Sequence, residues 1–114
     1  MIDVYGIKNC DTMKKALRWL DDHGVDYIFH DYKKEDASET VLQNAIAAHG
    51  WDSVINKRGT TWRRLPDDVK NAVNDQSAIT LAIENPSIIK RPLITAGDDV
   101  YLGFDEGVYE ESFL

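Results

Sequence analysis

The fold is decided by residues 2–32, which read IDVYGIKNCDTMKKALRWLDDHGVDYIFHDY. The first six of them, Ile2 to Ile7, are rich in β-branched and aromatic residues, which is typical of a buried strand. Residues from Val25 to Tyr32 favour a second strand for the same reason. Between the two strands, apolar side chains recur with helical spacing at Met13, Ala16, Leu17 and Leu20. A connection of this length predicts that the two strands pair in parallel across a helix.

The middle of the chain, at about residues 37–88, has a helical pattern. Asp36 and Glu39 fit the spacing of a capping box at the start of a helix. Pro66 suits the first position of another helix, and a further helical segment follows it. Residues 57–64, between the first of these helices and Pro66, indicate a polar, basic loop.

Two short apolar runs near the C-terminus, residues 93–95 and 100–102, flank a turn that contains Gly97. They predict a β-hairpin, and Asp105 can cap a final helix. The order β-α-β, helical insertion, β-β-α predicts an α/β fold with a mixed sheet of about four strands covered by helices. The length of 114 residues suits a single domain, residues 1–114.

Charge and composition exclude several kinds of partner. The net charge is −7, from 13 basic and 20 acidic residues, so we expect no general affinity for nucleic acid or an anionic membrane. No apolar run approaches the roughly 20 residues that span a bilayer, and no secretory signal is visible. One cysteine excludes an intrachain disulfide framework. Together these features predict a cytoplasmic protein.

The single cysteine, Cys10, is the first candidate for chemistry. A lone cysteine is more often an inert buried residue, but this one lies between the first strand and the first helix. Amide groups at a helix start favour thiolate over thiol, and Lys8, Lys14 and Lys15 add positive potential. Met13 occupies the position where a dithiol enzyme needs a second cysteine, so any disulfide chemistry must be monothiol.

The basic loop at residues 57–64 allows two interpretations. It carries Arg58, whose planar group binds carboxylates and phosphates, but it is equally well a solvated loop with Trp62 in the core. A proline before an apolar strand, as at Pro92, is often an edge or turn residue. The three histidines share no ligand spacing with one another or with Cys10, so we expect no metal site.

Three motifs together resemble a known family. They are Tyr5–Thr12, Arg58–Trp62 and Ile89–Ile94. The chain resembles the arsenate reductase-related family, which includes the Spx regulators, and is most similar to its YffB-type branch. The resemblance implies a thioredoxin-like fold with a helical insertion.

The resemblance also implies roles for individual residues. Cys10 matches the nucleophilic cysteine of the family. Arg91 matches an arginine near the oxyanion site, Pro92 matches a cis-proline that faces the thiol, and Arg58 is the nearest counterpart of a second arginine.

Three functions follow as hypotheses. The first is a glutathione-dependent monothiol oxidoreductase. Cys10 would be its nucleophile, Lys8 and the helix start would lower the thiol pKa, and Arg58 and Arg91 would hold carboxylates of glutathione. Glutathione is then a co-substrate, and we expect no tightly bound cofactor. Lys8, Arg58, Arg91 and Pro92 form the expected substrate-binding set.

The other two hypotheses are arsenate reduction and a non-enzymatic, Spx-like adaptor that binds a protein partner such as RNA polymerase. Arsenate reductases of the glutaredoxin-dependent kind have a third arginine after the last strand, where this chain has residues 102–105, LGFD. Spx-type regulators often have a Cys-x-x-Cys switch, which Met13 removes.

Overall fold

Four strands form one mixed sheet in the computed structural model, which describes all residues 1–114. They are β1 (Ile2–Gly6), β2 (Tyr27–Asp31), β3 (Leu93–Ala96) and β4 (Asp99–Leu102), in the order β2-β1-β3-β4. β1 pairs with β2 in parallel and with β3 antiparallel, and β3 and β4 form an antiparallel hairpin. This topology confirms the predicted mixed sheet and the thioredoxin-like fold.

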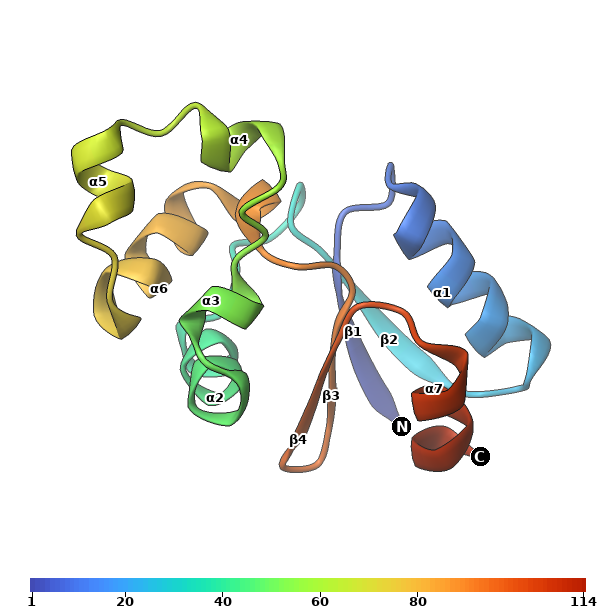
Figure 1. Cartoon of the computed structure of the whole chain (residues 1–114). Helices are drawn as coiled ribbons and strands as arrows, with labels where there is room; N and C mark the ends of the chain where they lie inside the picture. The colour runs from blue at the N-terminus through green and yellow to red at the C-terminus, as the bar shows by residue number, and fades with distance from the viewer. The chain divides into compact units, whose positions relative to one another are not determined.

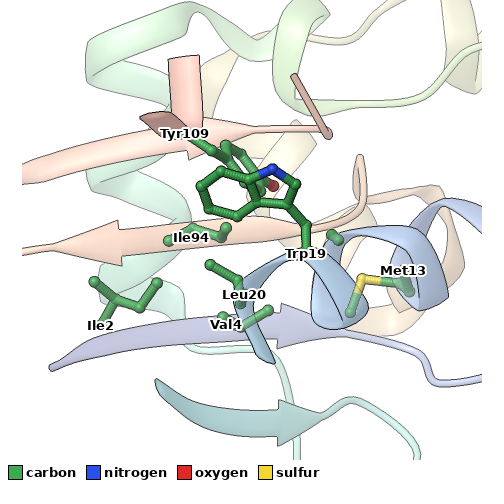
Figure 2. Packing of buried hydrophobic residues seen from close by; sticks show 8 residues of the cluster. Ile2, Val4, Met13, Trp19, Leu20, Ile94 and Tyr109 are labelled. Atoms are coloured by element: carbon green, nitrogen blue, oxygen red, sulfur yellow. The ribbon is translucent and has the colours of Figure 1, made fainter. Parts of the chain in front are cut away.

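Two helices, α1 (Asp11–Asp22) and α7 (Glu106–Phe113), cover one face of this sheet (Figure 1). Alternate residues of β1 are buried because a strand presents successive side chains to opposite faces. The core between sheet and helices contains Ile2, Val4, Met13, Ala16, Trp19, Leu20, Ile94 and Tyr109, most of which Figure 2 labels. This core fixes the position of α1 against β1, and thereby the position of the helix start.

Local signals at the C-terminal end of the sheet were predicted correctly. Gly97 adopts a φ of 61° in the hairpin turn, a conformation that residues with a Cβ rarely adopt. The side chain of Asp105 accepts a hydrogen bond from the backbone N–H of Val108 at 3.1 Å, which caps α7. The buried hydroxyl of Tyr109 donates to the carbonyl of Gly103 at 2.7 Å and ties α7 to the end of β4.

The remaining helices belong to the middle of the chain. They are α2 (Glu39–His49), α3 (Trp51–Val54), α4 (Thr60–Arg63), α5 (Asp67–Asn71), α6 (Asp75–Glu84) and the 3-10 helix η1 (Pro86–Ile88). An isolated antiparallel bridge joins Ile55 to Ile89.

Three details of the predicted middle segment are wrong. Ser38, not Asp36, caps α2, because its side chain accepts from the N–H of Val41 at 3.3 Å. The loop predicted at residues 57–64 contains α4, whose four residues are too few to produce a helical period in the sequence. Pro66 is the N-cap of α5 and not its first helical residue.

Contacts divide the chain into two compact units. One comprises Met1–Glu35 and Arg91–Leu114, and the other comprises Asp36–Lys90. A single domain with an insertion at about residues 37–88 stays a prediction. No helix in the chain has both the length and the apolar character that crossing a membrane requires.

Candidate active site

Cys10 is the N-cap residue of α1 and is partly exposed. Its backbone is extended, with φ −150° and ψ 130°, and its carbonyl accepts the first helical hydrogen bond from the N–H of Lys14 at 3.0 Å. The N–H of Cys10 donates to the carbonyl of Lys8 at 2.9 Å, which closes the turn between β1 and α1. The thiol therefore lies at the positive end of a helix, where solvent can reach it.

The surroundings of the thiol favour its ionised form. Burial raises the pKa of Cys10, but the backbone N–H of Met13, the charge of Arg91, the N–H of Thr12 and a hydrogen bond from Arg91 together lower it below its ordinary value. A thiolate is the nucleophilic form of cysteine, so the site is suited to attack on a disulfide.

Sheet topology brings Arg91 to this place. β1 and β3 are antiparallel, with Tyr5 opposite Leu93. The residues that precede β3 therefore lie beside those that follow β1. The Arg91–Pro92 peptide bond is cis, as the resemblance implies, and Pro92 is fully buried. The carbonyl of Pro92 accepts a hydrogen bond from the N–H of Gly103 at 2.8 Å, which fixes the start of β3.

Lys8 occupies a different environment from the one expected. Its ammonium lies 5.7 Å from the centre of the Phe29 ring on β2, in a cation–π arrangement. The groups that lower the pKa of Cys10 are amides and Arg91, and Lys8 is not one of them. Substrate binding by Lys8 stays a prediction.

Arg58 belongs to the second unit and is exposed just before α4. Its backbone N–H donates to the side chain of Asn56 at 3.1 Å. Nearby, Lys57 lies 4.9 Å from the centre of the Trp51 ring. Trp62 is buried, as one of the two interpretations of this loop requires, while Arg58, Arg63 and Arg64 remain exposed. A substrate-binding role for Arg58 stays a prediction.

Met13, three residues after Cys10, is completely buried between α1 and β1 (Figure 2). A Cβ atom added to Gly6 would lie 2.6 Å from its sulfur, so Gly6 provides the space that this side chain fills. A thioether cannot form a disulfide, and Cys10 is the only cysteine of the chain. The site therefore holds one thiol and no second thiol to resolve an adduct.

Comparison with known proteins identifies the family. The model of the ArsC family matches residues 5–112. The chain belongs to the ArsC family. A solved structure named YffB (PA3664) protein is 42% identical, with a TM-score of 0.96 and complete coverage of both chains. The solution structure of an arsenate reductase (ArsC) related protein from Brucella melitensis is 45% identical over 97% of this chain and 92% of its own, with a TM-score of 0.75.

A regulator is also among the relatives of this ArsC-family chain. Global transcriptional regulator Spx 1 of Lactococcus lactis is 28% identical over 93% of this chain and 84% of its own length. The similarity spans nearly the whole chain, including the segments that carry Cys10 and Arg91. The ArsC family membership shown by these comparisons agrees with the resemblance found in the sequence.

Sequence reasoning missed a cluster around His30. Its two ring nitrogens bond to carboxylates, Nε2 to Asp3 at 2.9 Å and Nδ1 to Glu35 at 2.8 Å, and its ring stacks on Tyr5 with centroids 4.4 Å apart. Burial lowers the pKa of His30, but the two carboxylates outweigh it and raise the pKa above its ordinary value. The register that pairs Tyr5 with His30 places them together, and a sequence without a known register gives no such signal.

Because of this cluster, we expect the free energy of unfolding to depend on pH. The folded-state pKa of His30 is raised, so its contribution is complete below the unfolded value of about 6.5 and is lost as pH rises through the folded value. We expect urea denaturation to show that His30→Gln destabilises the protein by about 1 kcal/mol or less at pH 6, because the ion pairs are partly exposed. The difference should shrink by pH 8.5. A difference that grows with pH would contradict this assignment.

Proposed function

We propose that the chain is a monothiol oxidoreductase that uses Cys10 as nucleophile and glutathione as co-substrate. The observation that carries the proposal is the partly exposed thiol at the N-cap of α1, where helix amides and Arg91 lower its pKa. Such an environment is typical of reactive cysteines and not of structural ones. Membership of a family that includes an arsenate reductase-related structure supports a thiol-based activity.

The proposed reaction proceeds in two exchanges. The Cys10 thiolate attacks the glutathionyl sulfur of a mixed disulfide, forms a Cys10–glutathione disulfide and releases the target thiolate. A glutathione thiolate then attacks the glutathionyl sulfur on Cys10, forms oxidised glutathione and releases the Cys10 thiolate. In the net reaction the target sulfur is reduced to a thiolate, and the incoming glutathione thiolate is oxidised because it ends in a disulfide with the glutathionyl group that the target released. The second exchange needs an external thiol because Met13 stands where a resolving cysteine would be.

Within this scheme, Arg91 has two roles. Its guanidinium stabilises the thiolate before attack, and it is proposed to bind a carboxylate of the glutathionyl group. Arg58 and Lys8 are proposed as further carboxylate ligands. Pro92, which is fully buried just before β3, is proposed to face the thiol.

The experiment that tests this function is adduct formation with oxidised glutathione. We expect intact-mass measurement to show one glutathionyl group on the native protein and none on Cys10→Ser. Added reduced glutathione should remove the group. A native protein that acquires no adduct, while the urea-unfolded chain does, would show that the folded site rejects glutathione.

A second candidate, a protein-binding adaptor, is favoured by the similarity to Spx 1 of Lactococcus lactis. This candidate does not need a reactive thiol. If Cys10→Ser still captured a partner in stoichiometric amount while the wild type turned over no glutathione, the adaptor function would replace the first. Arsenate reduction ranks below both, because residues 102–105 contain no arginine to hold an oxyanion.

A further inference from the structure

The charges on α1 oppose the dipole of the helix. Lys14, Lys15 and Arg18 lie in its first two turns, whereas Asp21 and Asp22 end it, and all five are exposed. Cations are unfavourable near a helix N-terminus and anions are unfavourable near a C-terminus. Asp11 is the only acid of the first turn, and the last turn has no base. The helix thus carries an arrangement that lowers its own stability.

No ion pair compensates these cations. The ion pairs of the structure join His30 to Asp3 and Glu35, and Lys70 to Asp67. Lys14, Lys15 and Arg18 pair with no acid, although Asp11 and Asp22 lie at helical spacings that would allow it. Solubility does not explain them either, because the chain already carries a net charge of −7. Charges that oppose a helix dipole, with no ion pair to offset the lost stability, are expected at functional positions.

The cations gather at the end of α1 that carries Cys10. Lys14 is one helical turn from Cys10, a spacing of about 5–6 Å between Cβ atoms. Lys8 precedes the thiol by two residues, and its ammonium remains exposed over Phe29. We call Lys8, Lys14 and Lys15 the α1 cationic patch. Arg18 is not part of it, because it lies about 12 Å from Cys10 along the helix axis and only one turn from Asp22. Asp21 and Asp22 lie at the opposite end, about 12 Å from Lys14 to Asp22 along the axis.

The main causes of the lowered pKa of Cys10 are the helix amides and Arg91. The α1 cationic patch acts in addition on what approaches the site. Exposed charges act through water over about 8 Å at physiological salt, so the patch reaches the surroundings of Cys10, and the acids at the far end of α1 are largely screened from them.

We infer that the α1 cationic patch makes Cys10 selective for disulfides flanked by negative charge. This inference rests on the proposed function and names its substrate class, an anionic disulfide. The carboxylates can belong to a small molecule such as a glutathionyl group or to an acidic segment of a protein. The patch raises the local concentration of such disulfides, after which the thiolate attacks one sulfur and the other leaves as a thiolate.

Three aliphatic disulfides that differ in charge test this selectivity. They are dithiodipropionate, which is dianionic, hydroxyethyl disulfide, which is neutral, and cystamine, which is dicationic. Rates of adduct formation on Cys10 are measured by acid quenching and intact mass for the wild type and for Lys14→Glu/Lys15→Glu. In low salt we expect the variant to lose about tenfold in rate with the dianion, to gain with the dication and to change little with the neutral probe.

A matched control reverses charge at the other end of the same helix. Asp22→Lys should leave the ratio of the three rates nearly unchanged. Salt at 0.5 M, which shortens the Debye length to about 4 Å, should remove the selectivity of the wild type. Lys14→Glu/Lys15→Glu should also raise the urea midpoint, because it places acids at the positive end of the dipole. The same substitution thus increases stability and decreases the reaction with anionic disulfides.

The outcomes separate this inference from the proposed function. Equal rate changes for all three probes, or selectivity that persists in high salt, would overturn the role of the patch while leaving Cys10 a reactive thiol. Failure of every probe to react with the native protein would overturn the proposed function itself.

To separate the two sources of negative charge, a glutathionyl group and an acidic protein segment, wild-type rates are compared between oxidised glutathione and an acidic peptide disulfide. Each is compared with its own neutralised analogue. A preference for neither acidic form would overturn the inference.

Discussion

Replacement of Arg91 by alanine is expected to raise the pKa of Cys10 and to slow its alkylation by iodoacetamide below neutral pH. The loss of a charge and of a hydrogen bond to the sulfur both favour the thiol form. For each unit by which the pKa rises, the thiolate fraction falls about tenfold, but a more basic thiolate is intrinsically more nucleophilic. The net loss in rate is then about threefold to fourfold per unit.

The same reasoning predicts that the alkylation rates of Arg91→Ala and the wild type, plotted against pH, cross. Above both pKa values all thiols are ionised, so Arg91→Ala should react faster than the wild type there. Arg18→Ala is a matched control, because it removes the same charge from an exposed position on α1 that does not contact the sulfur. Since iodoacetamide is neutral, that variant should behave as the wild type. Parallel profiles for Arg91→Ala and the wild type would contradict the role assigned to Arg91.

Replacement of Met13 by alanine is expected to destabilise the protein by about 2–5 kcal/mol. Met13 has no exposed surface and fills the space over Gly6, so its removal leaves a cavity in the core. Met13→Leu preserves most of the volume and should cost less than about 1.5 kcal/mol. Urea denaturation measures both values. If the two substitutions had equal effects, packing beneath the start of α1 would not be what holds it in place.

Most of the fold could be predicted from the sequence because its first and last segments carry strong local signals. Alternating and helical periods define β1, α1 and β2, and the turn at Gly97 and the cap at Asp105 define the elements at the C-terminal end. The prediction for the middle segment, residues 37–88, was less accurate. Its short helices, such as α4, are held by tertiary packing of single residues like Trp62, which leaves no periodic trace in the sequence.

The candidate site was predictable to a similar extent. The position of Cys10 before a helix follows from the strand–helix pattern alone, and its closeness to Arg91 follows from the resemblance and from antiparallel pairing of β1 and β3. The His30 cluster and the location of Lys8 over Phe29 depend on sheet register and on side-chain direction. A sequence without coordinates determines neither.

The central claim is that folding itself makes the thiol of Cys10 more acidic. The rate of alkylation by iodoacetamide as a function of pH measures this directly, with the same chain unfolded in urea as its internal reference. The account predicts a pKa in the native protein below that of the unfolded chain, for which a free thiol has about 8.5. A native pKa equal to or above the unfolded one would contradict it, because burial would then outweigh the helix amides and Arg91.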